Sequence, residues 1–443
     1  MNRKSNPRAA AVEALVKIEG GLFIQDALNQ VIIKYKLSKN NIALTTQIVY
    51  GTVRMQNLID FYLNYLSKLK VEKLNPKVRC ILRSGAYQII YLDRIPVSAA
   101  VNESVKLSPS KNRRRISGYI NAVLRNLVRN YQNIPLPELD SDPVEYISIN
   151  YSHPKWMVSR WIKRYGVDNT ISFCRINNKI PRVDVRVNTL KTSVEQLKNY
   201  FTAKNIDAMA VKYAPDVITL GTSSQIIEDP YFSAGYYYLQ NESSALTAYA
   251  VNPKAGEVVY DLCAAPGGKS THLAQLMNDQ GKIAAVDQTE ERVQLIRENA
   301  RRLGISIIKS YVGDASELHA LPADKVLVDA PCSGLGVLRQ NPDIKWRRTE
   351  EDINDLVELQ RKILNNAVSL VKPGGTLVYS TCTTEPEENE NMIRWFLHKY
   401  PQFKLADLPN WFPFSDKRGM LSIIPFVHGI DGFFICKMEN ISN

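Results

Sequence analysis

Apolar residues recur at helical spacing along the first third of the chain. Ile59, Leu63 and Leu66 are one example, because they are separated by four and three residues, as on one face of an α-helix. No alternation typical of strands interrupts this pattern between residues 6 and 131. The pattern predicts an all-α domain over residues 1–131.

The pattern changes after a polar stretch that contains Pro135, Pro137 and Pro143, which we interpret as a linker. Helical spacing returns near Trp161, and shorter elements follow. The expected elements are a strand over 182–188, a helix over 194–204 and short strands near 209–211 and 217–220. This order predicts a linker and a small α+β module over residues 132–235.

Strands and helices alternate from Val258 to the end of the chain. Strands are expected over 258–263, 283–287, 307–312, 325–329, 376–380 and 432–438, with helices over 290–303 and 353–371 among the connections. Such alternation is typical of a parallel, doubly wound sheet with helices on both faces. We therefore expect an α/β, Rossmann-like domain over residues 236–443.

One junction in this domain has the features of a cofactor turn. The apolar run 258–263 is followed by Pro266-Gly267-Gly268, and a helix-compatible run begins directly afterwards. Small residues let the backbone approach a ligand, which the unpaired N–H groups of the helix start then face. Asp287 stands twenty residues after Gly267, where a doubly wound fold places its acceptor for ribose hydroxyls. The junction predicts a site for an adenosine-bearing cofactor; the alternative is a structural turn that binds nothing.

The formal net charge of +12 over 443 residues favours a polyanionic partner, and nucleic acid is the first expectation. A basic cluster in the helical segment includes Arg113, Arg114 and Arg115, which can bind phosphates or can form a solvated face. No apolar run reaches the ~20 residues that span a bilayer, and the N-terminus lacks the apolar core of a signal peptide. We expect a cytoplasmic protein, monomeric and without a membrane segment.

The six cysteines are scattered along the chain and form no Cys-x-x-Cys pair. Their spacing predicts neither a zinc site nor a disulfide framework, so no metal is expected. Most of them should be small buried hydrophobic residues. Cys332 and Cys382 differ, because each follows a predicted strand.

Polar residues stand at the carboxyl ends of the predicted strands. Parallel strands bring these ends to one rim of the sheet, where ligands bind. The residues are Cys263 to Lys269, Asp287, Gly313-Asp314, Asp329 to Gly334 and Ser380 to Thr383. Independent packing explains any one of these groups, but it explains the whole set poorly.

Four motifs on this rim resemble those of the RNA 5-methylcytosine methyltransferases. They are Asp-Leu-Cys-Ala-Ala-Pro-Gly-Gly-Lys at 261–269, Asp-Ala-Pro-Cys-Ser-Gly at 329–334, Asn-Pro-Asp-Ile-Lys-Trp at 341–346 and Ser-Thr-Cys-Thr at 380–383. The first 130 residues or so resemble the RNA-binding helical domain of NusB, in segments such as Arg8 to Leu15 and Leu44 to Val53. Because this helical segment precedes the methyltransferase motifs, the whole chain resembles the RsmB (Sun) family of bacterial small-subunit ribosomal RNA methyltransferases.

The resemblance implies a cofactor, a substrate class and a role for each motif. It implies S-adenosylmethionine as the cofactor and RNA as the partner, with 16S rRNA as the expected substrate. It makes Cys382 the nucleophile and Cys332 the residue that assists product release. The cofactor contacts that it implies are Cys263, Ala264, Ala265, Pro266, Gly267, Gly268, Lys269, Asp287, Asp314 and Asp329.

Cysteine suits this reaction because carbon 5 of cytosine is too weak a nucleophile to attack a methyl sulfonium directly. A thiolate that adds to carbon 6 makes carbon 5 enamine-like. Asp329 is the candidate to stabilise the adduct near ring N3. Lys269 can lower the pKa of Cys382 or can cap the turn, and the sequence favours neither. The base that removes the carbon 5 proton stays open between water and Cys332.

Several basic and aromatic residues outside the rim motifs are candidates for contact with nucleic acid. Four of them follow the loop that contains Pro331 and Cys332, called the Pro-Cys loop below. They can hold an RNA backbone or can cap a surface helix, and they are Lys345, Trp346, Arg347 and Arg348. Those of the small module can contact nucleic acid, although core packing is the commoner use of tryptophan: Trp156, Trp161, Arg182 and Arg186.

Other functions fit the sequence less well than cytosine methylation in 16S rRNA. Methylation of another RNA, such as tRNA, needs the same residues. A nicotinamide-dependent oxidoreductase shares the fold and the ribose acid but leaves Cys332 and Cys382 unexplained. A non-catalytic RNA-binding assembly factor would not need the intact Pro-Cys and Ser-Thr-Cys motifs.

Overall fold

The computed structural model describes residues 5–110, 112–221, 226–412 and 419–442. The chain divides into two compact units. One contains the chain up to Lys179 together with Leu338–Arg347, and the other contains Ile180–Val337 and Arg348 onward. The division at 179/180 lies inside the segment 132–235, so the helices before it and the strands after it belong to different units.

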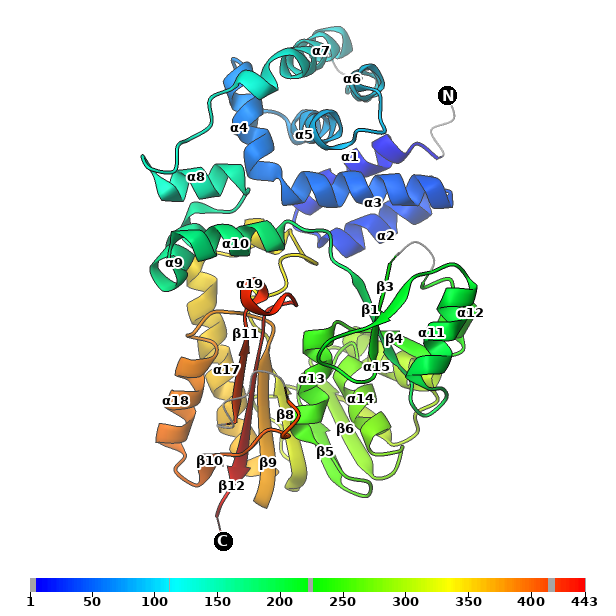
Figure 1. The fold of residues 1–443 in the computed structure, drawn as a ribbon, viewed down its shortest axis with the longest axis vertical. Helices are drawn as coiled ribbons and strands as arrows, with labels where there is room; N and C mark the ends of the chain where they lie inside the picture. The colour runs from blue at the N-terminus through cyan, green and yellow to red at the C-terminus, as the bar shows by residue number, and fades with distance from the viewer. Residues whose placement is uncertain (1–4, 111, 222–225, 413–418, 443) are drawn as a thin grey trace. The chain divides into compact units, whose positions relative to one another are not determined.

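The first unit is helical throughout the residues described, as the spacing of apolar residues predicted (Figure 1). Its helices are α1 (Pro7–Glu19), α2 (Ile24–Tyr35), α3 (Lys39–Arg54), α4 (Gln56–Leu66), α5 (Pro76–Tyr91), α6 (Val97–Lys106), α7 (Arg113–Asn130), α8 (Pro143–Asn150), α9 (Lys155–Tyr165), α10 (Val167–Asn177) and α16 (Ile344–Arg347), with 3-10 turns at Val71–Lys73 and Tyr131–Asn133.

Small residues let the central helices of this unit approach closely. A Cβ on Gly51 of α3 would lie 1.9 Å from the ring of Tyr87 on α5, so any larger residue there would displace this ring. Ala10, Ile48 and Leu124 are fully buried in the core around this contact.

The segment Leu338–Arg347 belongs to the helical unit, although it lies between two strands of the other unit in sequence. Lys345 is 1% exposed, and its Nζ donates to the carbonyls of Arg54 and Ser152, both at 2.8 Å. Trp346 Nε1 donates to Val53 O at 2.7 Å, and Arg347 Nη1 to Leu22 O at 2.8 Å. The expectation that these side chains hold an RNA backbone is therefore wrong, because their donors bind carbonyls of the helical unit.

The second unit contains, among its described residues, an eight-stranded sheet in the order β10-β12-β9-β8-β5-β6-β7, with β11 paired to β12. The strands are β5 (Val258–Asp261), β6 (Lys282–Asp287), β7 (Ile308–Val312), β8 (Ala323–Asp329), β9 (Val371–Thr381), β10 (Phe403–Leu405), β11 (Met420–Ile423) and β12 (Phe433–Asn440). The helices are α13 (Glu242–Val251), α14 (Gly268–Leu276), α15 (Glu290–Leu303), α17 (Glu350–Leu370), α18 (Glu390–Lys399) and α19 (Pro425–His428).

The strands β9, β8, β5, β6 and β7 are parallel, which confirms the doubly wound core. The order reverses between β5 and β8, and a ligand is expected at such a switch point. The predicted last strand is present at the other end of the sheet, where the pairing is antiparallel. There β12 pairs antiparallel with β9, β10 and β11. The connection from β11 to β12 is short and contains only the four-residue helix α19, whereas a parallel pair needs a longer crossover.

Alternating side chains divide the sheet into two buried faces. Val326 and Val328 of β8 pack in the same cluster as Ile363 of α17 and Phe396 of α18. Leu327, between them, packs in a second cluster with residues of α13 and α14. Because successive side chains of β8 point to opposite faces and both faces are buried, the strand is a continuous apolar run in the sequence.

A smaller antiparallel sheet precedes the large one, in the order β2-β3-β1-β4. Its elements are β1 (Val183–Val187), α11 (Val194–Ala203), β2 (Ala208–Ala210), β3 (Val217–Leu220), α12 (Pro230–Ser233) and β4 (Tyr237–Leu239). The predicted strand, helix and two strands are confirmed. Two of the three consecutive tyrosines at 236–238 begin β4, and Tyr237 is fully buried there.

Candidate functional site

The turn between β5 and α14 has the geometry of a ligand-binding backbone. Gly267 has a φ of +99°, and a Cβ there would lie 3.2 Å from the Cα of Ile296 on α15. The positive φ favours glycine at this position, and a Cβ would also push α15 away by a few tenths of an ångström. The helix α14 begins at Gly268, and the N–H groups of its first turn have no acceptor within the helix.

Asp287 joins the end of β6 to this turn. Its Oδ2 accepts from the N–H of Ala265 at 2.8 Å, and its Oδ1 accepts from the N–H of Gln288 at 2.8 Å. The guanidinium of Arg292 also pairs with the carboxylate, and its side chain is 55% exposed. The structure thus brings together Asp287 and the Pro-Gly-Gly turn, which the sequence placed at neighbouring strand ends.

Asp314 follows β7 on the same rim and remains exposed. Its Oδ1 accepts from the N–H and the hydroxyl of Ser316, at 2.8 and 2.7 Å. These hydrogen bonds lower the pKa of Asp314, so its carboxylate is ionised at neutral pH.

Lys269 and Asp329 form an ion pair between α14 and the end of β8. Lys269 Nζ lies 2.6 Å from Asp329 Oδ2, and Ser380 Oγ donates to Asp329 Oδ1 at 2.8 Å. Burial opposes the charge on Lys269, but the pKa of Lys269 is raised by the Asp329 carboxylate and, to a smaller extent, by Cys382. The ammonium therefore stays charged and orders the turn against β8.

The two cysteines of the rim lie in contact at the ends of adjacent parallel strands. Cys332 follows β8, Cys382 follows β9, and their sulfurs are 3.2 Å apart. The N–H of Cys382 donates to the sulfur of Cys332 at 3.3 Å. The contact with Cys382 and burial raise the pKa of Cys332 well above its usual range, so Cys332 is a thiol at neutral pH. Both residues are free cysteines that keep partial exposure.

A buried glutamate clamps the Pro-Cys loop and was not predicted as a site residue. Glu388 is fully buried, and its Oε1 accepts from the N–H of Ser333 at 2.8 Å and from Gln360 Nε2 at 3.0 Å. Burial raises the pKa of Glu388. Arg348, which we expected to contact RNA, instead donates to the carbonyls of Ser333 and Cys332 at 3.3 and 3.4 Å. Glu388 belongs to the acidic run Glu385-Pro386-Glu387-Glu388, a pattern that indicates a solvated surface more often than a buried contact.

Asp261, at the end of β5, is fully buried beneath the turn. Ser270 Oγ donates to its Oδ2 at 2.6 Å, while its Oδ1 has no hydrogen-bond partner among the residues described. Burial, together with the charge of Asp329, raises the pKa of Asp261 to about 7, although the Ser270 hydrogen bond opposes the shift.

Asp261→Asn is expected to remove a pH-dependent loss of stability. The folded protein keeps the proton up to about pH 7, whereas the unfolded chain loses it near 3.8, so the free energy of unfolding falls as the pH rises between these values. The difference between parent and variant should change by on the order of 1–4 kcal/mol across this window. Urea unfolding at a series of pH values measures it, and parallel curves for the two proteins would contradict the buried, protonated carboxyl.

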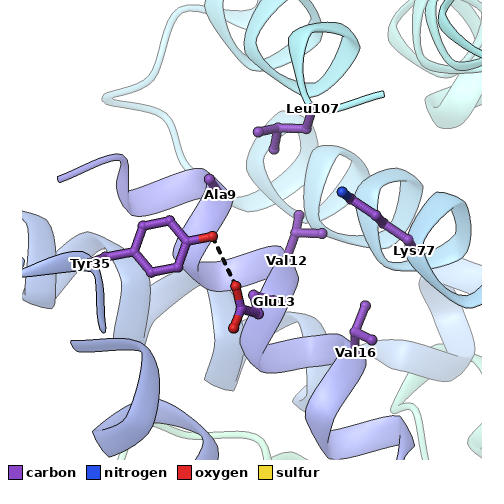
Figure 2. Close-up of a pocket in the computed structure, with 7 residues that line it drawn as sticks. All are labelled: Ala9, Val12, Glu13, Val16, Tyr35, Lys77 and Leu107. Atoms are coloured by element: carbon purple, nitrogen blue, oxygen red, sulfur yellow. Dashed lines mark hydrogen bonds between the residues drawn. The ribbon is translucent and has the colours of Figure 1, made fainter. Parts of the chain in front are cut away.

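A separate pocket of about 180 Å³ lies in the helical unit (Figure 2). It is lined by Ala9, Val12, Glu13, Val16, Tyr35, Lys77 and Leu107. Tyr35 and Lys34 both donate to Glu13, so its acidic group is already paired. The pocket contains none of the predicted site residues.

The described part of the chain offers neither a metal site nor a membrane-spanning helix. No group of three or more His, Cys, Asp and Glu side chains is arranged to hold a metal ion. No helix in this part of the chain combines the length and the apolarity that a membrane crossing needs.

The doubly wound sheet, its glycine turn and its acidic rim fit the class of S-adenosylmethionine-dependent methyltransferases, and the matching family models identify that class. The family model described as 16S rRNA methyltransferase RsmB/F matches residues 248–439. The NusB family model matches residues 5–129, and the ferredoxin-like domain of RsmF/B-like methyltransferases matches 153–226.

Full-length relatives define the family more closely. The probable ribosomal RNA small subunit methyltransferase B of Bacillus subtilis is 37% identical over 447 residues, which cover 99% of each chain. The chain therefore belongs to the RsmB/F family of RNA methyltransferases and is an enzyme that uses S-adenosylmethionine.

Solved structures agree with this assignment. The crystal structure of PH0851 superposes with a TM-score of 0.84 at 32% identity, covering 98% of this chain and 99% of that one. The structure of NSun6 from Pyrococcus horikoshii with SFG, an analogue of S-adenosylmethionine, has a TM-score of 0.60 at 25% identity and covers 66% of this chain and 99% of that one.

Proposed function

We propose that the enzyme methylates carbon 5 of a cytosine in 16S rRNA through a covalent adduct with Cys382. The observation that carries this proposal is the 3.2 Å contact between the sulfurs of Cys382 and Cys332 at the ends of two parallel strands. One thiol is enough for nucleophilic addition. A second thiol in contact with it supplies a partner for the release of the adduct.

The residues around the turn fit the cofactor. The helix start offers backbone N–H donors, Asp287 lies beside the turn as the acceptor for ribose hydroxyls, and the exposed carboxylate of Asp314 suits the adenine amino group. When bound, S-adenosylmethionine supplies an electrophilic methyl group on a positively charged sulfur. The negative charges of the rim suit a ligand with that charge.

Cys382 acts first, by addition of its thiolate to carbon 6 of the cytosine. The bond that forms transfers electron density to the ring, so carbon 5 becomes nucleophilic. As the thiolate adds, N3 takes a proton from solvent water and returns it to solvent when the product is released. Asp329, which is paired with Lys269 and hydrogen-bonded to Ser380, accepts a hydrogen bond from this N3 proton in the adduct. Lys269 supports this step by fixing both the turn and the carboxylate.

Release of the product requires loss of the carbon 5 proton and departure of Cys382. A water molecule at the rim takes the proton, and the electrons of the carbon–hydrogen bond restore the ring double bond while the carbon–sulfur bond breaks. Cys382 leaves as a thiolate. Cys332 donates a hydrogen bond from its thiol to this leaving sulfur, because its raised pKa keeps the thiol protonated.

The RNA is held in part by the helical unit. Arg113, Arg114 and Arg115 lie exposed at the start of α7, and no acidic residue stands in the first turn of that helix. Exposed arginines at a helix N-terminus bind phosphates, which position a substrate without reading its sequence. The choice of 16S rRNA follows the names of the relatives.

Transfer of a labelled methyl group from S-adenosylmethionine to rRNA tests the function. We expect incorporation into 16S rRNA at a single cytosine, located by bisulfite sequencing of rRNA from cells with and without the protein. In the same assay, the combined substitutions Arg113→Gln, Arg114→Gln and Arg115→Gln should raise the KM for RNA about tenfold or more, because three positive charges that bind phosphates are lost. The KM for S-adenosylmethionine should stay unchanged. Incorporation into tRNA alone, or into no RNA, would contradict the assignment.

A further inference from the structure

Arg186 is a fully buried arginine whose guanidinium ends on the cofactor turn. The residue lies on β1 of the small sheet and is 0% exposed, which excludes the nucleic-acid contact that the sequence had left open for it. Its Nη1 donates to the carbonyl of Gly268 at 2.6 Å, and its Nη2 donates to Thr271 Oγ1 at 2.9 Å. Nη1 also donates a hydrogen bond to Gln240 Oε1. One side chain of the small module therefore reaches the first turn of α14.

The surroundings keep this guanidinium charged despite its burial. Burial lowers the pKa of Arg186 to about 10, and the negative charge of Asp216 opposes that shift, so the group is a cation at neutral pH. The ring of Tyr238 lies 5.3 Å from its central carbon. A buried cation is unfavourable unless its donors find acceptors. Here the planar guanidinium donates to Gln240 on one segment and to Gly268 and Thr271 on another. The single ammonium of a lysine could not reach both segments in the same way.

The carbonyls that are held in the turn decide where its N–H groups point. Thr271 Oγ1 donates to Gly267 O at 2.7 Å, while Arg186 holds Gly268 O. In a trans peptide the N–H points away from the C=O of the same unit. The N–H groups of Gly268 and Lys269 are therefore directed away from Arg186. They lie in the first turn of α14, where N–H groups lack an acceptor within the helix.

Other residues of the small module hold the same helix further along. Gln275 Nε2 donates to Asn188 Oδ1 at 2.8 Å, and His272 Nε2 lies 2.9 Å from Asp216 Oδ2. Asn188 follows β1, and Asp216 precedes β3. The small sheet thus supports α14 along its length, and Arg186 makes the contact at the end that faces the cofactor.

We propose that Arg186 is a positioning residue for S-adenosylmethionine, because its hold on the Gly268 carbonyl fixes the direction of the N–H donors of the turn. The small module then serves the cofactor pocket as well as any RNA that it contacts. This role concerns cofactor affinity alone, so it does not depend on which nucleotide is methylated.

Isothermal titration of the full-length protein with S-adenosylmethionine tests the proposal. We expect Arg186→Met to raise the Kd about tenfold or more, with kcat at saturating cofactor and the KM for RNA changed by less than about threefold. Arg186→Lys should give a smaller rise. Arg182→Met is the matched control, because Arg182 is exposed just before the same strand, and it should leave the Kd unchanged.

Thermal unfolding of the cofactor-free variants separates positioning from folding. Thr271→Val removes an acceptor of the guanidinium with little change in volume, and it takes the place of Arg186→Met if that variant does not fold. A folded variant at position 186 or 271 with a Kd within twofold of the parent would overturn the proposal. A lower melting temperature with an unchanged Kd would also overturn it, since the contact would then be structural only.

Discussion

Replacement of Cys382 by alanine is expected to lower methyl transfer at least about 10³-fold, which corresponds to a barrier higher by about 4 kcal/mol or more. The reason is chemical, because carbon 5 of cytosine is not nucleophilic until a group has added to carbon 6. Among the side chains on the rim, the thiol of Cys382 is the one at the end of β9 with partial exposure and a second thiol in contact. A water molecule does not replace this thiol as the group that adds to carbon 6, because neutral water is a weak nucleophile and hydroxide is scarce at neutral pH.

Labelled methyl transfer to rRNA measures this loss, and cofactor titration supplies the control. Cys382→Ala should bind S-adenosylmethionine with the Kd of the parent, because the turn is held by Asp287, Lys269 and Arg186. Cys382→Ser should also be almost inactive, since its hydroxyl is a much poorer nucleophile near pH 7. Activity of Cys382→Ala within tenfold of the parent would rule out the covalent route.

The sequence predicted the rim because its residues follow strands that are parallel. Asp329 and Ser380 end neighbouring strands, so their contact at 2.8 Å follows from the fold class. The contact between Cys332 and Cys382 follows from the same topology. In such cases one local pattern, a strand followed by polar residues, determines which side chains meet.

Residues with partners in distant segments were beyond prediction. Lys345 and Arg186 are charged residues in sequences that suggest exposure, yet both are fully enclosed. Their acceptors are backbone carbonyls such as those of Arg54 and Gly268, which carry no signal in a sequence. The buried Glu388 was equally hidden, because an acidic run usually indicates a solvated surface.

The same limit explains the last strands of the sheet. The run that became β12 was recognised as a strand, but its direction depends on β10 and β11, which are short and lie beside it. Short strands with few alternating positions give a weak periodic signal. The segment Leu338–Arg347 is a further case, since its place in the helical unit depends on contacts such as that of Trp346 with Val53.

The Lys345 and Trp346 contacts also bear on how RNA binding can be dissected. Deletion of residues 1–130 would remove the acceptors of both side chains in α3. The buried Lys345 would lose the Arg54 carbonyl and keep the Ser152 carbonyl as an acceptor, so the deletion would disturb the segment directly beyond the Pro-Cys loop. Substitution of the exposed arginines at the start of α7 avoids this damage, so a change in RNA affinity can then be attributed to the RNA contact.

Cys332→Ala is expected to trap a covalent complex between Cys382 and RNA, while turnover falls about 10²-fold or more. The alanine removes the thiol that lies 3.2 Å from the leaving sulfur, so addition and methyl transfer proceed but departure of Cys382 is slow. A denaturing gel should show a protein–RNA band that carries the labelled methyl group and disappears after digestion with ribonuclease. Cys332→Ala combined with Cys382→Ala is the control, and it should give no band.

Cys332→Ser distinguishes the two ways in which Cys332 can assist release. A serine hydroxyl is a hydrogen-bond donor but a very poor base, because its pKa lies far above neutrality. If Cys332 acts as a donor to the leaving thiolate, as its raised pKa indicates, serine should restore part of the turnover and weaken the trapped band. If Cys332 removes the carbon 5 proton, serine should behave like alanine. Absence of a stable band for Cys332→Ala, in a variant that still binds RNA and cofactor, would contradict any role of this thiol in release.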